Sequence, residues 1–146
     1  MITARFFAIS LILLMMTVSC GEPQNSPRNT VIQLFGAMER NDRAAVNDIL
    51  DLPSLMEKGV EDYALQADTP RVFYSPDEIL DDLTGEGETR KRWFSLQRIV
   101  GAADIKGDTA FVEISFVDKA KSIQYFNKFG LRKINGRWKI YSFRTM

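Results

Sequence analysis

Cys20 is the single cysteine of this 146-residue chain, and its thiol is a group that could act as a nucleophile or a metal ligand. A thiolate nucleophile usually needs a neighbouring base or a positive environment, and the chain contains no histidine. A single cysteine also excludes a disulfide within the chain. One cysteine and no histidine are too few Cys and His ligands for a metal site of that kind, and we expect no cofactor.

The residues before Cys20 predict a secretory signal. The chain is almost entirely apolar from Phe6 to Val18, Arg5 precedes this run, and the small residue Ser19 follows it. The run is shorter than the roughly 20 residues that a bilayer-spanning helix needs. A positive residue, a short apolar run and a small-residue cleavage site are together typical of a signal peptide. The alternatives are a signal cut at another position and an uncleaved anchor.

The segment TVSCG, at positions 17–21, resembles the lipobox of bacterial lipoproteins. The resemblance implies cleavage between Ser19 and Cys20 and acylation of Cys20, for example by palmitate. Two or more acyl chains hold a protein stably on a bilayer, whereas one chain does so only marginally. Gly21 stands where Asp would favour retention in the inner membrane. We therefore expect a lipoprotein of the cell envelope, anchored in the outer membrane and facing the periplasm.

These observations divide the chain into three parts. They are a signal peptide (1–19), a lipidated cysteine with a polar tether (20–26) and a single domain (27–146). The 19 basic and 19 acidic residues balance, so we expect no nucleic-acid partner. The domain is long enough for one apolar core, which must stabilise it without disulfides.

Four side chains are candidates for lining a ligand pocket: Arg98, Tyr63, Tyr74 and Trp138. Arg98 is in register with the apolar residues of a predicted strand, and its guanidinium could orient an anionic ligand as a planar fork. The alternative is that Arg98 reaches the rim of the domain or pairs with a carboxylate. Aromatic residues at these spacings are more typical of a core. No segment matches a catalytic motif, so we assign no catalytic residue.

Several charged clusters have plain structural interpretations. TRKRW (89–93) is of a kind that contacts phosphate or lipid headgroups, but DEILDD (77–82) lies nearby and compensates its charge. Asp77 and Glu78 suit a helix N-terminus. Asp81 and Asp82 lack the ligand spacing of a calcium loop. Glu113 is expected to be a solvated strand residue rather than a general base.

The first half of the domain has helical periodicity. Ser26 and Pro27 predict a helix start, and the apolar residues that follow recur at helical spacing. Asp42 predicts the cap of a short second helix that ends before Pro53. The remaining predicted elements are capping boxes at 54–57 and 75–78 that open two more helices, a short strand at 71–74 and a loop at 85–88.

The second half alternates in hydrophobicity and predicts antiparallel strands at about 94–102, 110–117, 123–132 and 137–143. Asn135-Gly136 predicts a two-residue type I′ turn, which fixes the register of the last hairpin. In that register Phe129 lies opposite Ser142. Tyr141 and Phe143 then lie on the outer, mixed face of the sheet, and Trp138 lies on the core face.

Helices followed by antiparallel strands predict an α+β fold, with N-terminal helices packed on a curved sheet of four to five strands. The segments SPRNTVIQLFGAMERNDRAAVNDIL, YSPDEILDDL, IKGDTAFVEISF and INGRWKIYSF resemble the nuclear-transport-factor-two-like superfamily, also described as a cystatin-like cone. The resemblance implies that the sheet wraps the first helix and leaves a pocket at the open end. It also implies a homodimer through the outer sheet face.

Two functional hypotheses follow. The first is a non-catalytic, lipid-anchored envelope domain that binds a small apolar or amphipathic ligand or a protein partner. The second is an isomerase or hydrolase without histidine that uses an Asp/Tyr pair in the cone. The predicted anchor, the outer-face residues Tyr141 and Phe143 and the lack of a catalytic motif favour the first.

Overall fold

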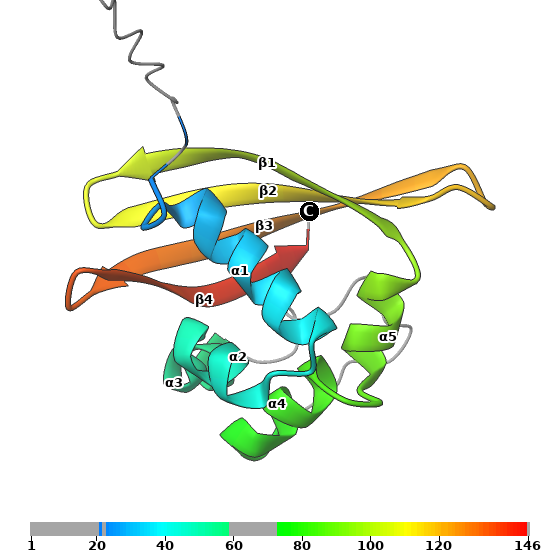
Figure 1. Cartoon of the computed structure of the whole chain (residues 1–146), viewed down its shortest axis with the longest axis horizontal. Coiled ribbons are helices and arrows are strands. Elements are labelled where there is room, and N and C mark those ends of the chain that lie inside the picture. The colour runs from blue at the N-terminus through cyan, green and yellow to red at the C-terminus, as the bar shows by residue number, and fades with distance from the viewer. Residues whose placement is uncertain (1–20, 22, 59–72, 146) are drawn as a thin grey trace, which may run out of the picture.

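The computed structural model describes residues 21, 23–58 and 73–145, and these form five helices and four strands. The helices are α1 (Pro27–Glu39), α2 (Arg43–Ile49), α3 (Leu52–Lys58), α4 (Pro76–Leu83) and α5 (Glu88–Phe94). The strands are β1 (Gln97–Lys106), β2 (Thr109–Asp118), β3 (Ile123–Ile134) and β4 (Arg137–Thr145). They form one antiparallel sheet in the order β1-β2-β3-β4, and α1 lies across one face of it (Figure 1). The predicted α+β fold is confirmed.

Side-chain caps set the starts of three helices. The Ser26 hydroxyl accepts a hydrogen bond from the Asn29 amide at 3.1 Å and begins α1. Asp42 caps α2 through the Ala45 amide at 3.0 Å. Ser75 caps α4 in the same way. Each oxygen satisfies an amide that the helix itself leaves unpaired, as the sequence predicted.

The start of α3 differs from the prediction. The helix begins at Leu52, and the Asp51 carboxylate accepts a bond from the Ser54 amide at 3.4 Å. Pro53 therefore lies inside the first turn and does not simply end the preceding helix. This position suits proline because its missing N–H would have had no partner there. The predicted strand at 71–74 lies partly outside the described residues, and Phe73 and Tyr74 form no strand.

Helix α5 was not expected from the sequence. Its cap comes from another helix, because the Asp82 carboxylate of α4 accepts a bond from the Thr89 amide at 3.2 Å. Trp93 belongs to the basic TRKRW segment (89–93), for which the sequence suggests a surface position, but its side chain is fully buried. A cap supplied from another helix leaves no local sequence signature, so spacing alone could not reveal it.

The last hairpin follows the predicted register only for part of its length. Leu131 pairs with Ile140 as expected, but a bulge between Gly130 and Leu131 shifts the pairing beyond that point. Phe129 then lies opposite Phe143, not Ser142. Phe143 is consequently fully buried, and its predicted place on the outer face is wrong.

Gly130 explains where the bulge occurs. A Cβ atom at this position would lie 2.8 Å from Cζ of Tyr141, so the tyrosine ring occupies the space over the glycine. Such an approach is closer than a real side chain allows. A glycine inside a strand often marks a bulge or a close approach, and here it marks both.

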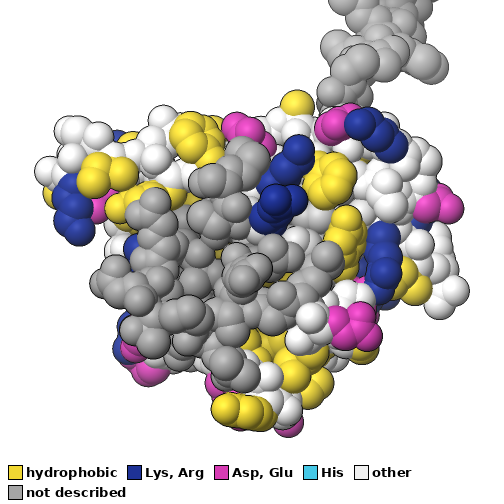
Figure 2. All heavy atoms as spheres, turned by 180° about the vertical axis from the view of Figure 1, so that it is seen from behind, with side chains coloured by type: hydrophobic (Ala, Val, Ile, Leu, Met, Phe, Trp, Pro, Cys, Tyr) yellow, Lys and Arg dark blue, Asp and Glu magenta, His cyan; other side chains and the backbone are white. Residues whose placement is uncertain are grey.

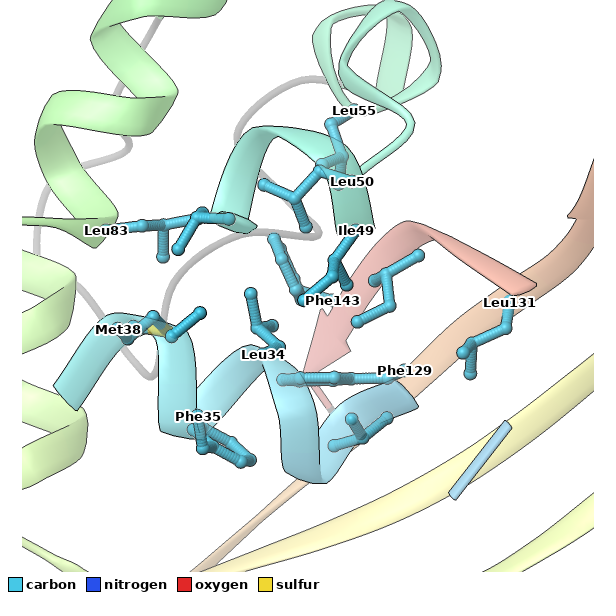
Figure 3. Close-up of a cluster of buried hydrophobic side chains, with 14 of the residues drawn as sticks. Leu34, Phe35, Met38, Ile49, Leu50, Leu55, Leu83, Phe129, Leu131 and Phe143 are labelled. Carbon is cyan, nitrogen blue, oxygen red and sulfur yellow. The ribbon is translucent and has the colours of Figure 1, made fainter. Parts of the chain in front are cut away.

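The core lies between α1 and the inner face of the sheet. Figure 3 shows Leu34 and Met38 of α1, Leu83 of α4 and Phe143 of β4 pointing toward one another. Ile49 and Leu50 approach the same cluster from the end of α2. Burial of such side chains is the main favourable term in folding.

Both outer edges of the sheet have contacts from the helical layer. Leu50 forms a parallel bridge to Ile140 of β4, and the Asp51 amide donates to the Ile140 carbonyl at 2.8 Å. At the opposite edge, β1 has a register shift between Val100 and Ala103. There the Arg28 guanidinium of α1 donates to the Gly101 and Val100 carbonyls at 3.1 and 3.3 Å.

Candidate functional site

Aromatic rings fill the middle of the cone. The ring centroid of Trp93 lies 5.5 Å from those of Phe116 and Phe129 and 5.4 Å from that of Phe143. Phe35 of α1 approaches Trp93 edge-on at 5.8 Å. Such tilted and edge-to-face contacts are favourable beyond the area they bury. The rings bury one another and form a packed core.

Two buried polar atoms in this aromatic cluster have no partner among the described residues. They are Nε1 of Trp93, a donor, and Oδ1 of Asn127, an acceptor. The amide nitrogen of Asn127 donates to the Phe143 carbonyl at 2.8 Å, and the Trp93 ring contacts Phe143, so both side chains adjoin the same residue. A buried polar atom without a partner costs about 1–3 kcal/mol. A water molecule or a ligand hydroxyl has the chemistry to satisfy either atom.

Arg98 lies at the start of β1, beside the end of α5. Its guanidinium carbon is 4.0 Å from the centroid of the Phe94 ring, and Nη1 donates to the Trp93 carbonyl at 3.0 Å. Burial lowers the pKa of this guanidinium, and the charge of Glu39 opposes that shift. The group thus serves the last carbonyls of α5, and a role toward an anionic ligand stays a prediction.

Of the other predicted pocket residues, Tyr74 and Trp138 are described. Tyr74 is 82% exposed before α4, and Trp138 is 7% exposed at the start of β4. Arg98 pairs through Phe116 with Tyr125, whereas Trp138 pairs with Lys133 on the same strand β3. Eight residues of strand separate those two levels by about 26 Å. Tyr63 lies outside the described residues.

The charged clusters mainly hold the helices together. Arg90, from the basic cluster, donates to the Met38 carbonyl at 2.9 Å and so caps the end of α1. Asp77 and Asp81 both pair with Arg43 of α2, at 3.1 and 2.5 Å. Glu113 is exposed on the outer sheet face, as expected. These contacts gave no local signal in the sequence, because each joins separate elements.

Two carboxylates that lie close to the sheet, those of Asp51 and Asp118, already accept hydrogen bonds from neighbouring groups. Asp51, only 8% exposed, caps α3 and accepts from Nε of Arg132 at 2.8 Å. Asp118 and Tyr125 share the inner face near the β2–β3 turn, but Asp118 accepts from the Ala120 and Lys121 amides at 3.1 Å. In the part of the chain that the structure describes, no group of three His, Cys, Asp or Glu residues is placed to hold a metal.

Three clefts formed by described residues lie on the outside of the domain. Two of about 390 and 420 Å³ adjoin each other over the α4–α5 loop, where Asp81, Glu86 and Gly87 line both. The third, of about 280 Å³, lies between the start of α1 and the β3–β4 hairpin, with Asp48 and Trp138 in its lining. Most of the residues that line them are polar or charged, whereas a typical small-molecule pocket is lined mainly by hydrophobic and aromatic side chains.

Large exposed hydrophobic residues gather on the sheet. In the described residues there are seven of them, and five lie on β1 or β3: Ile99, Ile105, Ile123, Phe126 and Ile134. Ile99 and Phe126 both pair with Ser115, so they flank it on the outer face, and they are 48% and 36% exposed. Figure 2 shows a surface on which described hydrophobic side chains lie in separate groups beside Lys and Arg.

Comparison with known proteins supports the fold alone. No family model matches the chain, and no curated protein matches it. A solved structure of a designed NTF2-like protein of the Rd1NTF2 series is similar, with a TM-score of 0.57 and 14% identity. The match covers 86% of this chain and 100% of the designed chain. The chain has an NTF2-like cone fold. In the described residues no helix is long and apolar enough to cross a bilayer.

Proposed function

We propose that this chain is a lipid-anchored, non-catalytic domain of the cell envelope that binds a protein partner through the outer face of its sheet. The observation that carries the proposal is the exposed pair Ile99 and Phe126, which flank Ser115 on that face. Exposed apolar side chains that gather on one face of a folded domain often mark interaction sites. The anchor itself rests on the sequence around Cys20.

The packed cone makes a small-molecule ligand the less favoured occupant. Trp93, Phe116, Phe129 and Phe143 are each fully buried by their neighbours, so their surfaces are already used in the core. The two unpartnered atoms on Trp93 and Asn127 are the observation that favours a ligand, and a hydroxyl-bearing apolar molecule fits them best. An enzyme remains the alternative, but the engaged carboxylates give it less support than either form of binding.

A photo-crosslinking residue in place of Phe126 tests the protein-binding proposal. The matched control is the same residue in place of Ile32, which is 39% exposed on α1 against 36% for Phe126. We expect a crosslinked product in intact cells from position 126 and not from position 32. A product of twice the monomer mass would identify a homodimer, and another mass a different protein. No product from position 126, or equal products from both, would contradict the proposal.

A further inference from the structure

The start of the described chain lies at one particular end of the sheet. The Asn25 amide group donates to the Gly136 carbonyl at 3.0 Å, and the Gln24 carbonyl accepts from Asn29 of α1 at 3.0 Å. These bonds fix the chain beside the β3–β4 turn. Figure 1 shows the β1–β2 turn at the same end of the sheet and the β2–β3 turn at the opposite end.

We call the first of these the tether end, defined by Ile105–Asp108 and Lys133–Arg137. The two hairpins touch there, because the Lys133 amide donates to the Asp108 carbonyl at 2.7 Å. The far end is the β2–β3 turn, residues 119–122. The twelve residues of strand β3 separate position 122 from position 135, a distance of about 40 Å.

The short tether decides which end lies near a bilayer. Asn25 lies five positions after Cys20, and a fully extended chain over five such steps spans about 17 Å. This is less than half the length of the sheet. With Cys20 lipidated, as the proposed function requires, the tether end is therefore always within a short distance of the headgroups.

The side chains at the tether end suit that position. Ile105 and Ile134 are 53% and 36% exposed, and Lys106 and Arg137 have side chains 76% and 61% exposed. Their ion pairs, with Asp104 and Asp48, are solvent-exposed, and such pairs hold little free energy. Basic side chains near an anionic lipid surface contribute about 1 kcal/mol each, and apolar side chains insert among the headgroups.

We infer that the tether end docks on an anionic lipid bilayer, with Ile105, Lys106, Lys133 and Ile134 in contact with the headgroup layer. The inference rests on the proposed lipid anchor. Composition alone would not choose this end, because the far turn also carries Lys119, Lys121 and the exposed Ile123. The tether end is favoured because the chain from Cys20 joins the domain there. The outer-face pair Ile99 and Phe126 then lies toward the far end, directed away from the membrane.

Fluorescent labels at the two ends test the orientation. Cysteine is introduced as Asp108→Cys at the tether end and, as a matched turn position, Lys119→Cys at the far end. The full-length protein, processed in cells, is labelled and reconstituted into vesicles of phosphatidylcholine with phosphatidylglycerol that carry a nitroxide quencher on the headgroup. We expect several-fold stronger quenching at position 108 than at 119. Equal quenching, weak quenching at both positions or stronger quenching at 119 would overturn the inference.

A control separates this inference from the anchor. The parent chain has only Cys20, which takes up no thiol label once it is acylated. If the parent chain is labelled, the anchor is wrong and the docking inference fails with it. If the parent stays unlabelled and floats with vesicles but the two positions quench alike, only the docking inference fails.

Charge reversal tests the contact itself. Lys106→Glu with Lys133→Glu should lower the quenching at position 108 several-fold while the protein still floats with the vesicles. The matched pair at the far end, Lys119→Glu with Lys121→Glu, should leave it unchanged. The same loss with the far-end pair, or no loss with the tether-end pair, would show that these lysines do not contact the lipid.

Discussion

The two faces of the sheet differ in how far their hydrophobic side chains are buried. On the inner face, Phe116, Phe129 and Phe143 pack with Trp93 of α5, and all four side chains are fully buried. On the outer face, Ile99 and Phe126 stay partly exposed beside a serine. The inner face therefore supplies stability, and the outer face is free to change without loss of the fold. A domain of this fold whose cone is filled by its own side chains has its surface left for binding.

The largest expected effect separates the two faces directly. Trp93→Ala removes the ring on which four others pack, and we expect a loss of about 3–5 kcal/mol in the free energy of unfolding. Phe126→Ala should cost less than about 1 kcal/mol, because its ring is exposed at 36%. Urea unfolding followed by circular dichroism measures both. Similar losses for the two variants would contradict the division between the faces.

The second prediction concerns the bulge that sends Phe143 inward. Gly130→Ala places a methyl group where the Tyr141 ring lies, and we expect a loss of about 1–2 kcal/mol as the ring is displaced. Tyr141→Ser removes the obstacle, so the added cost of the alanine should largely vanish in the double variant. Additive losses in a double-mutant cycle would show that the ring is not what excludes a side chain there.

A third test addresses the helical cover of the β4 edge. Asp51→Ala removes the cap of α3 and the partner of Arg132, and we expect a loss of about 1–2 kcal/mol. The side chain of Arg132 is 44% exposed, so water can solvate its charge and the loss stays well below that of a fully buried pair. Asp51→Asn, which keeps a capping oxygen, should recover part of the stability. Thermal unfolding of both variants checks the order.

The smallest expected effect is at the exposed cluster around Asp48. The hydrogen bond from Arg137 holds the pKa of this carboxyl below its ordinary value of 3.8. A carboxyl whose pKa is lower in the folded state stabilises the fold above its unfolded pKa, and this contribution is lost as the pH falls below about 4. Asp48→Asn should remove this small acid-dependent part and leave stability at neutral pH nearly unchanged. A large loss at pH 7 would contradict it.

The oligomeric state in solution is a further test of the outer face of the sheet. The family resemblance implies a homodimer through the outer face, and Ile99 and Phe126 lie on that face. Phe126→Lys should leave the fold intact, since the side chain is already exposed, while it shifts the solution mass from dimer to monomer. A monomeric parent protein would contradict the homodimer and leave a different protein as the expected partner.

The sequence predicted the elements whose signals are local. Ser26, Asp42 and Ser75 lie beside the amides they cap, and Asn135-Gly136 forms its own turn, so each could be recognised from neighbouring residues. Helix α5 could not, because its cap comes from Asp82 on another helix. Its burial of Trp93 depends on rings from four other elements, α1, β2, β3 and β4. Arg90 likewise acts on carbonyls some 50 positions earlier.

The register error on β4 has a more instructive cause. A tight turn fixes the pairing of two strands only as far as the first irregularity. Because the prediction extended the regular alternation beyond that point, it placed Phe143 on the outer face. Gly130 was the available signal, since a glycine in a strand interior favours a bulge. Recognising the bulge would have moved Phe143 to the core. The candidate pocket could not be predicted in the same way. Whether aromatic rings enclose a cavity or fill it depends on side-chain packing, which the spacing of residues in the sequence does not determine.

The contacts at the two rims of the sheet have a consequence for behaviour at high concentration. A strand with free backbone groups is a template on which another chain can extend the sheet. Here the Asp51 amide occupies the Ile140 carbonyl on one rim, and Arg28 occupies the carbonyls beside the β1 irregularity on the other. These contacts reduce the number of free backbone groups on both rims, so we expect them to lower the tendency of crowded copies to extend the sheet strand by strand.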